Sequence, residues 1–231
     1  MILVHERRDK MLKRRLKQFL PDEIIQIYRG FHQKRFEVLA KIPPVEKVLV
    51  VGAHTYGSAN IKILFRDSGE KVIIGKYCSI APNVTVLLGG GHHLDWTTTY
   101  PFGSVNHDVF ESNSSIDHST SKGSVKIGND VWIGIGATIM SGVSIGNGAV
   151  IAANSHVVSD VPAYGIYGGN PARLVKFRFD TETIARLDQI RWWDFSDLQI
   201  NEIRVSLLQE PTEKFLKNLE EIRQKITVES E

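Results

Sequence analysis

The sequence predicts a mainly-β fold: a solenoid of short parallel strands, with an excursion loop and flanking N- and C-terminal helices. Between residues 127 and 162 an aliphatic residue recurs every six positions, and a smaller residue stands two positions before each one. A period of six fits neither a helix nor simple strand alternation, but it fits a three-sided solenoid with three hexads per turn. The aliphatic positions, expected to point inward, are Ile127, Ile133, Ile139, Ile145, Ile151 and Val157; the smaller ones, expected near the corners, are Val125, Val131, Ala137, Val143, Ala149 and Ser155.

The same pattern occurs earlier in the chain, but in a different phase. Ile74, Ile80 and Val86 take the aliphatic slot, and residues 48–57 resemble a further, degenerate piece. The separation of Ile74 and Ile127 is one position short of a multiple of six, so a segment between the two runs leaves the solenoid. Residues 87–124 are this segment, and a long excursion from a rigid scaffold favours a functional role. The predicted β-helical domain covers 46–179.

The N-terminal extension, residues 1–45, is predicted to be basic and helical over 6–40, with a break near Pro21. Residues 1–41 hold 11 Lys and Arg against 5 Asp and Glu, so the basic charge of the chain is concentrated there. A basic amphipathic helix over 6–20 suits peripheral contact with an anionic membrane. The alternative is a helix that packs on its own or a neighbouring subunit and leaves a solvated basic face.

The C-terminal segment, 180–231, is predicted to be helical. Asp180 or Thr181 is the expected N-cap of its first helix, and the last helix is expected over about 211–226. We expect these helices to pack on the side or end of the solenoid and to cover an open strand edge.

Composition excludes several classes of protein. Apolar residues make up 42% and charged residues 23% of 231, which excludes a wholly disordered chain, and no apolar run is long enough to span a membrane. The first residues lack a secretory signal, which predicts a cytoplasmic location. Cys78 is the only cysteine, so a disulfide framework and a multi-cysteine zinc site are excluded. It occupies a small-residue slot and is expected to be interior packing. No nucleic-acid partner is expected, because the basic charge is confined to one terminus.

The residues best suited to chemistry stand where the excursion begins, in the run His92-His93-Leu94-Asp95. A neutral imidazole takes a proton from a hydroxyl while that oxygen attacks a carbonyl, and a nearby carboxylate can orient the ring. From the residues alone, the alternative that a histidine merely packs or meets solvent stays open.

The hexads resemble those of the hexapeptide-repeat proteins, which implies a left-handed parallel β-helix. GGGHHLDWTTTYPF, residues 89–102, resembles the corresponding segment of the xenobiotic acetyltransferases, a subgroup of the hexapeptide-repeat acyltransferases. Matched residue by residue, His92 takes the place of the catalytic base, Asp95 that of the Asp in the family's pattern, and 99–102 that of the closing Thr-Tyr-Pro-Phe. Gly91 departs from the Asn that usually precedes the base. The resemblance covers about 72–195.

This resemblance implies acetyl-CoA-dependent acetyl transfer in a homotrimer, with CoA lying along the outside of the coils between two subunits. It implies no metal. His93 and Tyr100 are assigned to binding of a small-molecule or glycan acceptor. Arg173 and Lys176 carry charges that suit the CoA phosphates. The full set of implied cofactor-binding residues is Trp132, Ile135, Ala153, Val158, Ser159, Asn170, Pro171, Arg173 and Lys176.

Several functions remain compatible with these residues. Our first choice of acceptor is a carbohydrate hydroxyl of a surface polysaccharide or glycolipid, because the basic N-terminus suits work near a membrane. The alternative acceptor is an antibiotic, a streptogramin or chloramphenicol. Two alternatives belong to other classes: a non-catalytic trimeric scaffold that presents residues 103–124, and a zinc hydrolyase that draws ligands from His92, His93, His107 and His118.

Overall fold

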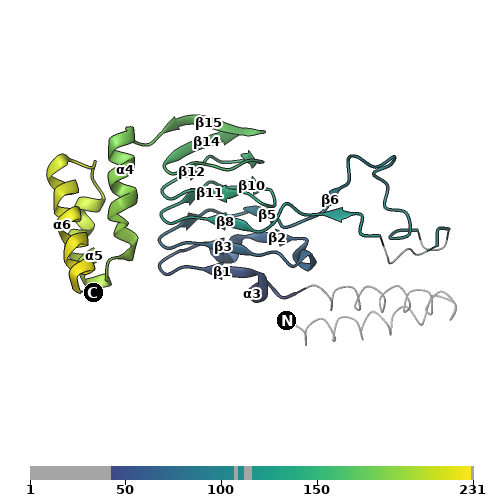
Figure 1. The fold of residues 1–231 in the computed structure, drawn as a ribbon, viewed down its shortest axis with the longest axis horizontal. Coiled ribbons are helices and arrows are strands. Elements are labelled where there is room, and N and C mark those ends of the chain that lie inside the picture. The colour runs from purple at the N-terminus through teal and green to yellow at the C-terminus, as the bar shows by residue number, and fades with distance from the viewer. Residues whose placement is uncertain (1–42, 107–108, 112–115, 230–231) are drawn as a thin grey trace, which may run out of the picture. The chain divides into compact units, whose positions relative to one another are not determined.

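The computed structural model describes residues 43–106, 109–111 and 116–229 (Figure 1). The chain divides into two compact units, Met1–Pro43 and Pro44–Glu231, and the helices and strands described all belong to the second. The predicted helix over 6–40, and with it the membrane contact through 6–20, lies outside the described residues. None of the helices in the described ranges has the length and apolar character needed to cross a membrane.

After the short helix α3 (Val45–Val48), the chain winds through three sheets in turn. Every strand pair within them is parallel except the last, β14 with β15. The first sheet holds β1 (Leu49–Val51), β3 (Val72–Ile74), β8 (Val125–Ile127) and β11 (Ser144–Ile145). The second holds β4 (Ser79–Ile80), β9 (Trp132–Ile133), β12 (Val150–Ile151), β14 (Gly165–Gly169) and β15 (Ala172–Phe177). The third holds β2 (Lys62–Leu64), β5 (Thr85–Leu87), β10 (Thr138–Ile139) and β13 (His156–Val157).

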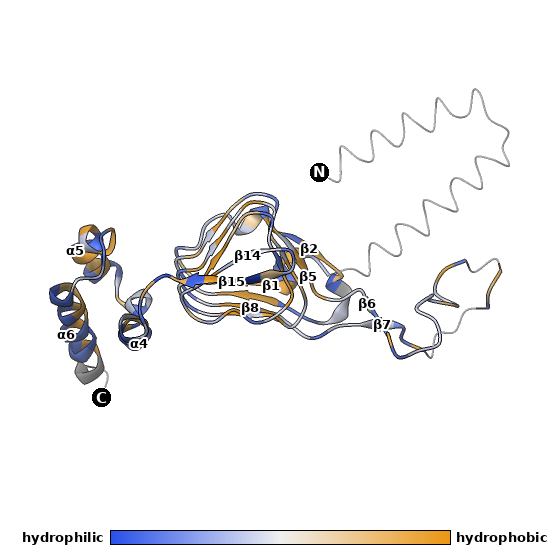
Figure 2. Ribbon diagram, turned by 90° about the horizontal axis from the view of Figure 1, so that it is seen from above, coloured by the Kyte–Doolittle hydropathy of each residue, from blue (hydrophilic) through white to orange (hydrophobic). Residues whose placement is uncertain are grey.

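The strand register confirms that three hexads make one turn. Lys126 pairs with Ser144, Trp132 with Val150, and Thr138 with His156, so each residue meets its counterpart three hexads further along the chain. All the aliphatic and small slots predicted between 125 and 157 are buried, and all of them except the polar Ser155 belong to one continuous hydrophobic core. Figure 2 looks along the stack of coils, and in this view the coils overlie one another with a three-sided outline. The predicted parallel solenoid is therefore confirmed for this unit.

Two insertions leave the coils at the same corner, where the third sheet passes to the first. The first coil carries a strand that the hexad count missed, β2, because the stretch from Lys62 to its partner Thr85 is longer than three hexads. The extra residues form the 3₁₀ turn Arg66–Ser68. The second insertion is the excursion between β5 and β8, which separates Val72 from its partner Val125. The frame shift seen in the sequence thus has a structural cause.

The short insertion supports the base of the long one. Gly90 has a φ of +79°, and a Cβ placed on it would lie 2.4 Å from the ring of Phe65, so any other residue there would strain the backbone and displace that ring. On the returning arm, the Ser124 hydroxyl donates to a carboxylate oxygen of Glu70 at 2.6 Å. Beyond this base, β6 (Gly91–His92) pairs antiparallel with β7 (Ser119–Thr120), and the excursion projects from its corner (Figure 1).

Three helices follow the coils: α4 (Thr181–Ile190), α5 (Asp197–Leu207) and α6 (Glu213–Glu229). The predicted N-cap is confirmed, because the Asp180 carboxylate accepts from the Thr183 backbone N–H at 2.8 Å, and this bond lowers the pKa of Asp180. The helices share a second hydrophobic cluster made of Tyr164, Leu187, Ile190, Phe195, Ile203, Leu216 and Leu219.

These helices lie against the side of the solenoid, at the corner between the first and second sheets. The Lys76 ammonium donates to Asp194 at 2.9 Å, and Asn147 donates to Asp188 at 2.8 Å. In the second sheet the edge beyond β14 is occupied by the strand β15. The expectation that these helices also cover a strand edge stays a prediction. The helices and the excursion occupy different corners of the coils (Figure 2).

Candidate functional site

His92, the last residue of β6, is held in an orientation that suits a general base. Its Nδ1 lies 2.6 Å from the Thr99 carbonyl oxygen. A carbonyl only accepts hydrogen bonds, so the ring proton of neutral His92 sits on Nδ1 and Nε2 keeps its lone pair. The side chain is exposed, which leaves Nε2 accessible to an acceptor. The arrangement is the one a base of this kind needs, although the catalytic role of His92 stays a prediction.

Asp95, which we expected to orient His92, lies closer to His93. One of its carboxylate oxygens is 3.9 Å from Nδ1 of His93, and its side chain is 84% exposed. The His93 ring stacks on Trp96, with centroids 4.1 Å apart and planes within 3°. The orienting contact on His92 comes instead from the Thr99 backbone. Sequence reasoning could not find it, because a carbonyl contact depends on loop geometry and carries no residue-type signal.

Tyr100 belongs to a small aromatic cluster in the excursion. Its ring lies 4.7 Å from that of Phe102, which lies 4.9 Å from that of Phe110. The Asn106 side-chain amide donates to the Tyr100 hydroxyl. Tyr100 and Phe102 remain 40% and 54% exposed, so the cluster presents apolar surface beside His92 rather than a closed core. The assignment of Tyr100 and His93 to acceptor binding remains a prediction.

A second imidazole, which the sequence marked only as a candidate metal ligand, also approaches the base. The His118 ring centroid is 6.1 Å from that of His92, and its Nδ1 is 3.0 Å from the Ser104 hydroxyl. His107, another candidate ligand, lies outside the described residues. Over the ranges that the structure describes, no three His, Cys, Asp or Glu residues are grouped to hold a metal.

Four of the residues implied in CoA binding lie above one another along one edge of the coils, where the second sheet passes to the third. They are Ile135, Ala153, Asn170 and Pro171. Ile135 and Ala153 occupy equivalent positions on successive turns, since Asn154 donates its backbone N–H to the Ile135 carbonyl at 2.8 Å. The turn between β14 and β15, which contains the cis peptide Asn170–Pro171, continues this column on the next turn. All four side chains are at least partly open to solvent, and that of Ile135 is 48% exposed.

The other implied residues are more scattered. Trp132 points outward from β9 and is 57% exposed, and Arg173 and Lys176 are exposed on β15. Val158 and Ser159 follow β13, so they lie at the other end of the third sheet, at the corner from which the excursion leaves. Within one chain, therefore, His92 and the Ile135–Ala153 column lie at opposite ends of the third sheet.

Comparison with known proteins decides the family. The family model of bacterial transferase hexapeptides (six repeats) matches residues 124–159, which contain β8 to β13. A probable macrolide acetyltransferase of Lysinibacillus sphaericus is 46% identical over 142 residues, which make up 61% of this chain and 79% of that protein. The chain belongs to the hexapeptide-repeat acetyltransferases.

Two further relatives place this hexapeptide-repeat acetyltransferase in the predicted xenobiotic subgroup. A chloramphenicol acetyltransferase of Klebsiella aerogenes is 43% identical over 133 residues, 57% of this chain and 63% of that protein. A virginiamycin A acetyltransferase of Staphylococcus aureus is 37% identical over 162 residues, 67% of this chain and 74% of that protein. The prediction of an acetyl-transferring enzyme is confirmed, and a non-catalytic scaffold is disfavoured.

Proposed function

We propose that the protein is an acetyl-CoA-dependent O-acetyltransferase that acts on an antibiotic hydroxyl, as in chloramphenicol or a streptogramin. The observation that carries this proposal is the exposed His92, whose Nδ1 is tied to the Thr99 carbonyl at 2.6 Å so that Nε2 is free to act as a base. The relatives named above support an antibiotic acceptor. They favour it over the carbohydrate acceptor that was our first choice, whose argument rested on an N-terminal segment outside the described residues.

The chemistry needs one proton-accepting group and one oxyanion donor. His92 Nε2 removes the proton from the acceptor hydroxyl while that oxygen bonds to the thioester carbonyl carbon. A backbone N–H stabilises the negative charge on the carbonyl oxygen of the tetrahedral intermediate. When the carbon–sulfur bond breaks, the imidazolium returns its proton to the sulfur, which leaves an acetyl ester and a free thiol. Holding both substrates together contributes much of the rate.

The residues of the coils fit an extended thioester substrate. Ile135 and Ala153 offer an exposed, largely apolar column on successive turns, which suits a pantetheine arm. Arg173 and Lys176 are exposed cations on β15 and could hold phosphates. Trp132 offers an exposed indole for an apolar contact. These roles, and those of Val158, Ser159, Asn170 and Pro171, are part of the proposal.

We further propose a left-handed sense for the coils and a homotrimeric assembly, as the resemblance implies. The support for an assembly is that His92 and the Ile135–Ala153 column lie at opposite ends of the third sheet. Within one subunit they do not meet, so a complete site needs His92 of one subunit beside the Ile135–Ala153 column of a neighbouring subunit. The proposed domains are a basic extension over 1–45, the β-helical catalytic domain over 46–179 with loop 87–124, and the helical segment 180–231.

An acceptor panel tests the proposed function. Wild-type protein is incubated with acetyl-CoA and with chloramphenicol, virginiamycin, a macrolide or simple sugars, and free thiol is followed against a reaction without acceptor. The proposal expects acceptor-dependent release with at least one antibiotic and none with the sugars. Release with sugars alone would restore the carbohydrate acceptor. Absence of release with every acceptor, together with no binding of acetyl-CoA, would contradict the proposed activity.

A further inference from the structure

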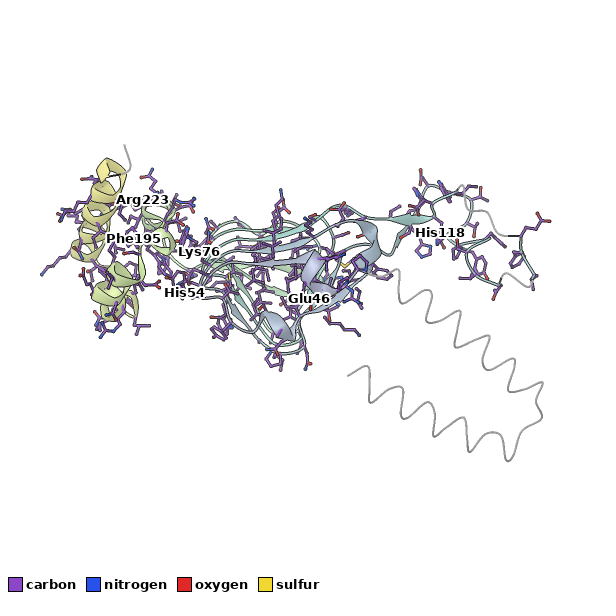
Figure 3. All side chains as sticks on the ribbon, turned by 90° about the horizontal axis from the view of Figure 1, so that it is seen from below. Glu46, His54, Lys76, His118, Phe195 and Arg223 are labelled. Carbon is purple, nitrogen blue, oxygen red and sulfur yellow. The ribbon has the colours of Figure 1, made fainter. Side chains whose placement is uncertain are left out.

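The excursion places a second, independently held imidazole beside the proposed base. His92 comes from the outgoing arm and His118 from the returning arm, and the antiparallel pairing of His92 with Ser119 fixes the two arms together. The two ring centroids are 6.1 Å apart, with planes inclined by 59°. Figure 3 shows His118 on the excursion, far from His54 and Lys76 at the helix-bearing corner. The position of His118 thus belongs to the candidate site.

Among the described residues, the hydrogen bonds of the two rings engage only Nδ1 of each, and neither Nε2 has a partner there. Nδ1 of His92 donates to the Thr99 carbonyl, and Nδ1 of His118 is paired with the Ser104 hydroxyl at 3.0 Å. A hydroxyl both donates and accepts, so Nε2 of His118 can present either a proton or a lone pair. This flexibility suits recognition of another hydroxyl, which also donates and accepts.

We propose that His118, supported by Ser104, binds a second hydroxyl of the acceptor, so that the enzyme selects a diol in which this hydroxyl lies one or two carbons from the one that is acetylated. This inference rests on the proposed function and specifies its acceptor class. His92 Nε2 hydrogen-bonds the hydroxyl that is acetylated, and His118 Nε2 hydrogen-bonds the second hydroxyl. The contact fixes which oxygen meets the base, because a diol bound through both rings has one orientation.

Other roles for His118 fit the surroundings less well. A proton relay needs a carboxylate on the ring, and within the described residues His118 forms no ion pair with one. The Asp117 carboxylate accepts from the Ser119 backbone N–H at 2.9 Å, and that of Asp95 faces His93. A metal site needs a third ligand, and the described residues hold no such group. A purely structural role would not call for an ionisable ring that is only half-buried in a loop.

The test uses chloramphenicol, which carries a primary and a secondary hydroxyl on one short chain, and its analogue without the secondary hydroxyl. His118→Phe is expected to raise the KM for chloramphenicol about 10- to 100-fold, because it leaves a substrate hydroxyl without its hydrogen-bond partner. The KM for acetyl-CoA should not change. His118→Gln, which keeps a polar group near the Nε2 position, should recover most of the loss, and Ser104→Ala should give a smaller rise in KM.

The analogue provides the decisive comparison. With it, wild type and His118→Phe should have the same KM, because the group that His118 binds is missing. His54→Phe, a matched change at the opposite corner, should leave both acceptor KM values unchanged. The inference is overturned if His118→Phe leaves the KM for chloramphenicol unchanged, or raises it equally for the analogue. A wild-type enzyme that acetylates virginiamycin but not chloramphenicol overturns the diol inference and leaves the proposed function intact. Absence of acceptor-dependent release together with no binding of acetyl-CoA overturns both.

Discussion

The regular coils and the excursion are neighbouring stretches of chain that are ordered in different ways. In the coils every sixth residue is buried and each strand pairs with the strand three hexads away, so one rule positions every side chain. In the excursion, Leu94, Tyr100 and Phe102 are exposed, and order comes from single contacts such as that of His92 with Thr99. The comparison teaches that the repeat supplies a regular scaffold, and that a departure from the repeat at one corner holds the candidate base, His92.

The largest expected effect on stability comes from a matched pair of isoleucines in one coil. Ile133 is fully buried and Ile135, the next outward-facing isoleucine of the same turn, is 48% exposed. Ile133→Ala should lower the free energy of unfolding by about 2–5 kcal/mol, because it leaves a cavity in the solenoid core. Ile135→Ala should cost less than about 1 kcal/mol. Urea unfolding of both variants measures the difference.

The same pair separates folding from function. Ile135→Ala should raise the KM for acetyl-CoA about tenfold, through the loss of an apolar contact. Equal stability losses for the two variants would contradict the inward and outward assignment. An unchanged KM in Ile135→Ala would remove this residue from the thioester-binding column.

A smaller effect is expected from a pair of glycines that tests the support of the excursion. Gly90 and Gly69 both have positive φ, of +79° and +82°, but a Cβ on Gly90 would meet the Phe65 ring, whereas one on Gly69 has nothing within 4 Å. Gly69→Ala should cost only the backbone strain, about 1–2 kcal/mol. Gly90→Ala should cost more and should also lower kcat/KM, because the displaced ring moves the arm that carries His92. Thermal unfolding measures the effect on stability, and the thiol-release assay measures the effect on activity. Equal activity in the two variants would contradict the claim that Phe65 supports the arm that carries His92.

The smallest expected effect concerns the helix-bearing corner. Burial tends to raise the pKa of Asp194, but hydrogen bonds from Lys76 and Arg191 outweigh it and hold that pKa below the usual range. A carboxyl with a lowered folded-state pKa stabilises the fold above its unfolded pKa, and this stability is lost as the pH falls through the folded value. Lys76→Met should therefore lower stability at pH 7 by about 1 kcal/mol or less, since the pair is partly exposed.

The difference between wild type and Lys76→Met should shrink as the pH falls below the pKa of an ordinary aspartate. Urea unfolding at several pH values measures it. Thiol release at pH 7 should be unaffected, because this corner is remote from His92. A stability difference that stays constant with pH would show that Lys76 contributes through packing of its alkyl chain rather than through the carboxylate.

The sequence predicted the regular coils well and the contacts within the excursion poorly. The hexad pattern predicted the inward positions from Ile127 to Val157 and the limits of the excursion, because a repeated packing environment repeats its residue types. It missed β2, since the turn at Arg66–Ser68 shifts the phase. Within the site it selected His92 by residue type, but not the Thr99 carbonyl that orients it or the Ser104–His118 pair beside it. Those contacts join residues whose proximity is set by a loop with no period to read.

The central claim is that His92, held by the Thr99 carbonyl, is the proton acceptor in acetyl transfer. The most direct measurement is kcat for acceptor-dependent thiol release, at saturating acetyl-CoA, by wild type, His92→Ala and the matched neighbour His93→Ala. The account predicts a loss of about 10²- to 10⁴-fold for His92→Ala, the usual contribution of a general base, with acetyl-CoA binding retained. His93→Ala should change mainly the acceptor KM. A His92→Ala enzyme that keeps most of its kcat while His93→Ala loses it would contradict the claim and move the base one residue along the chain.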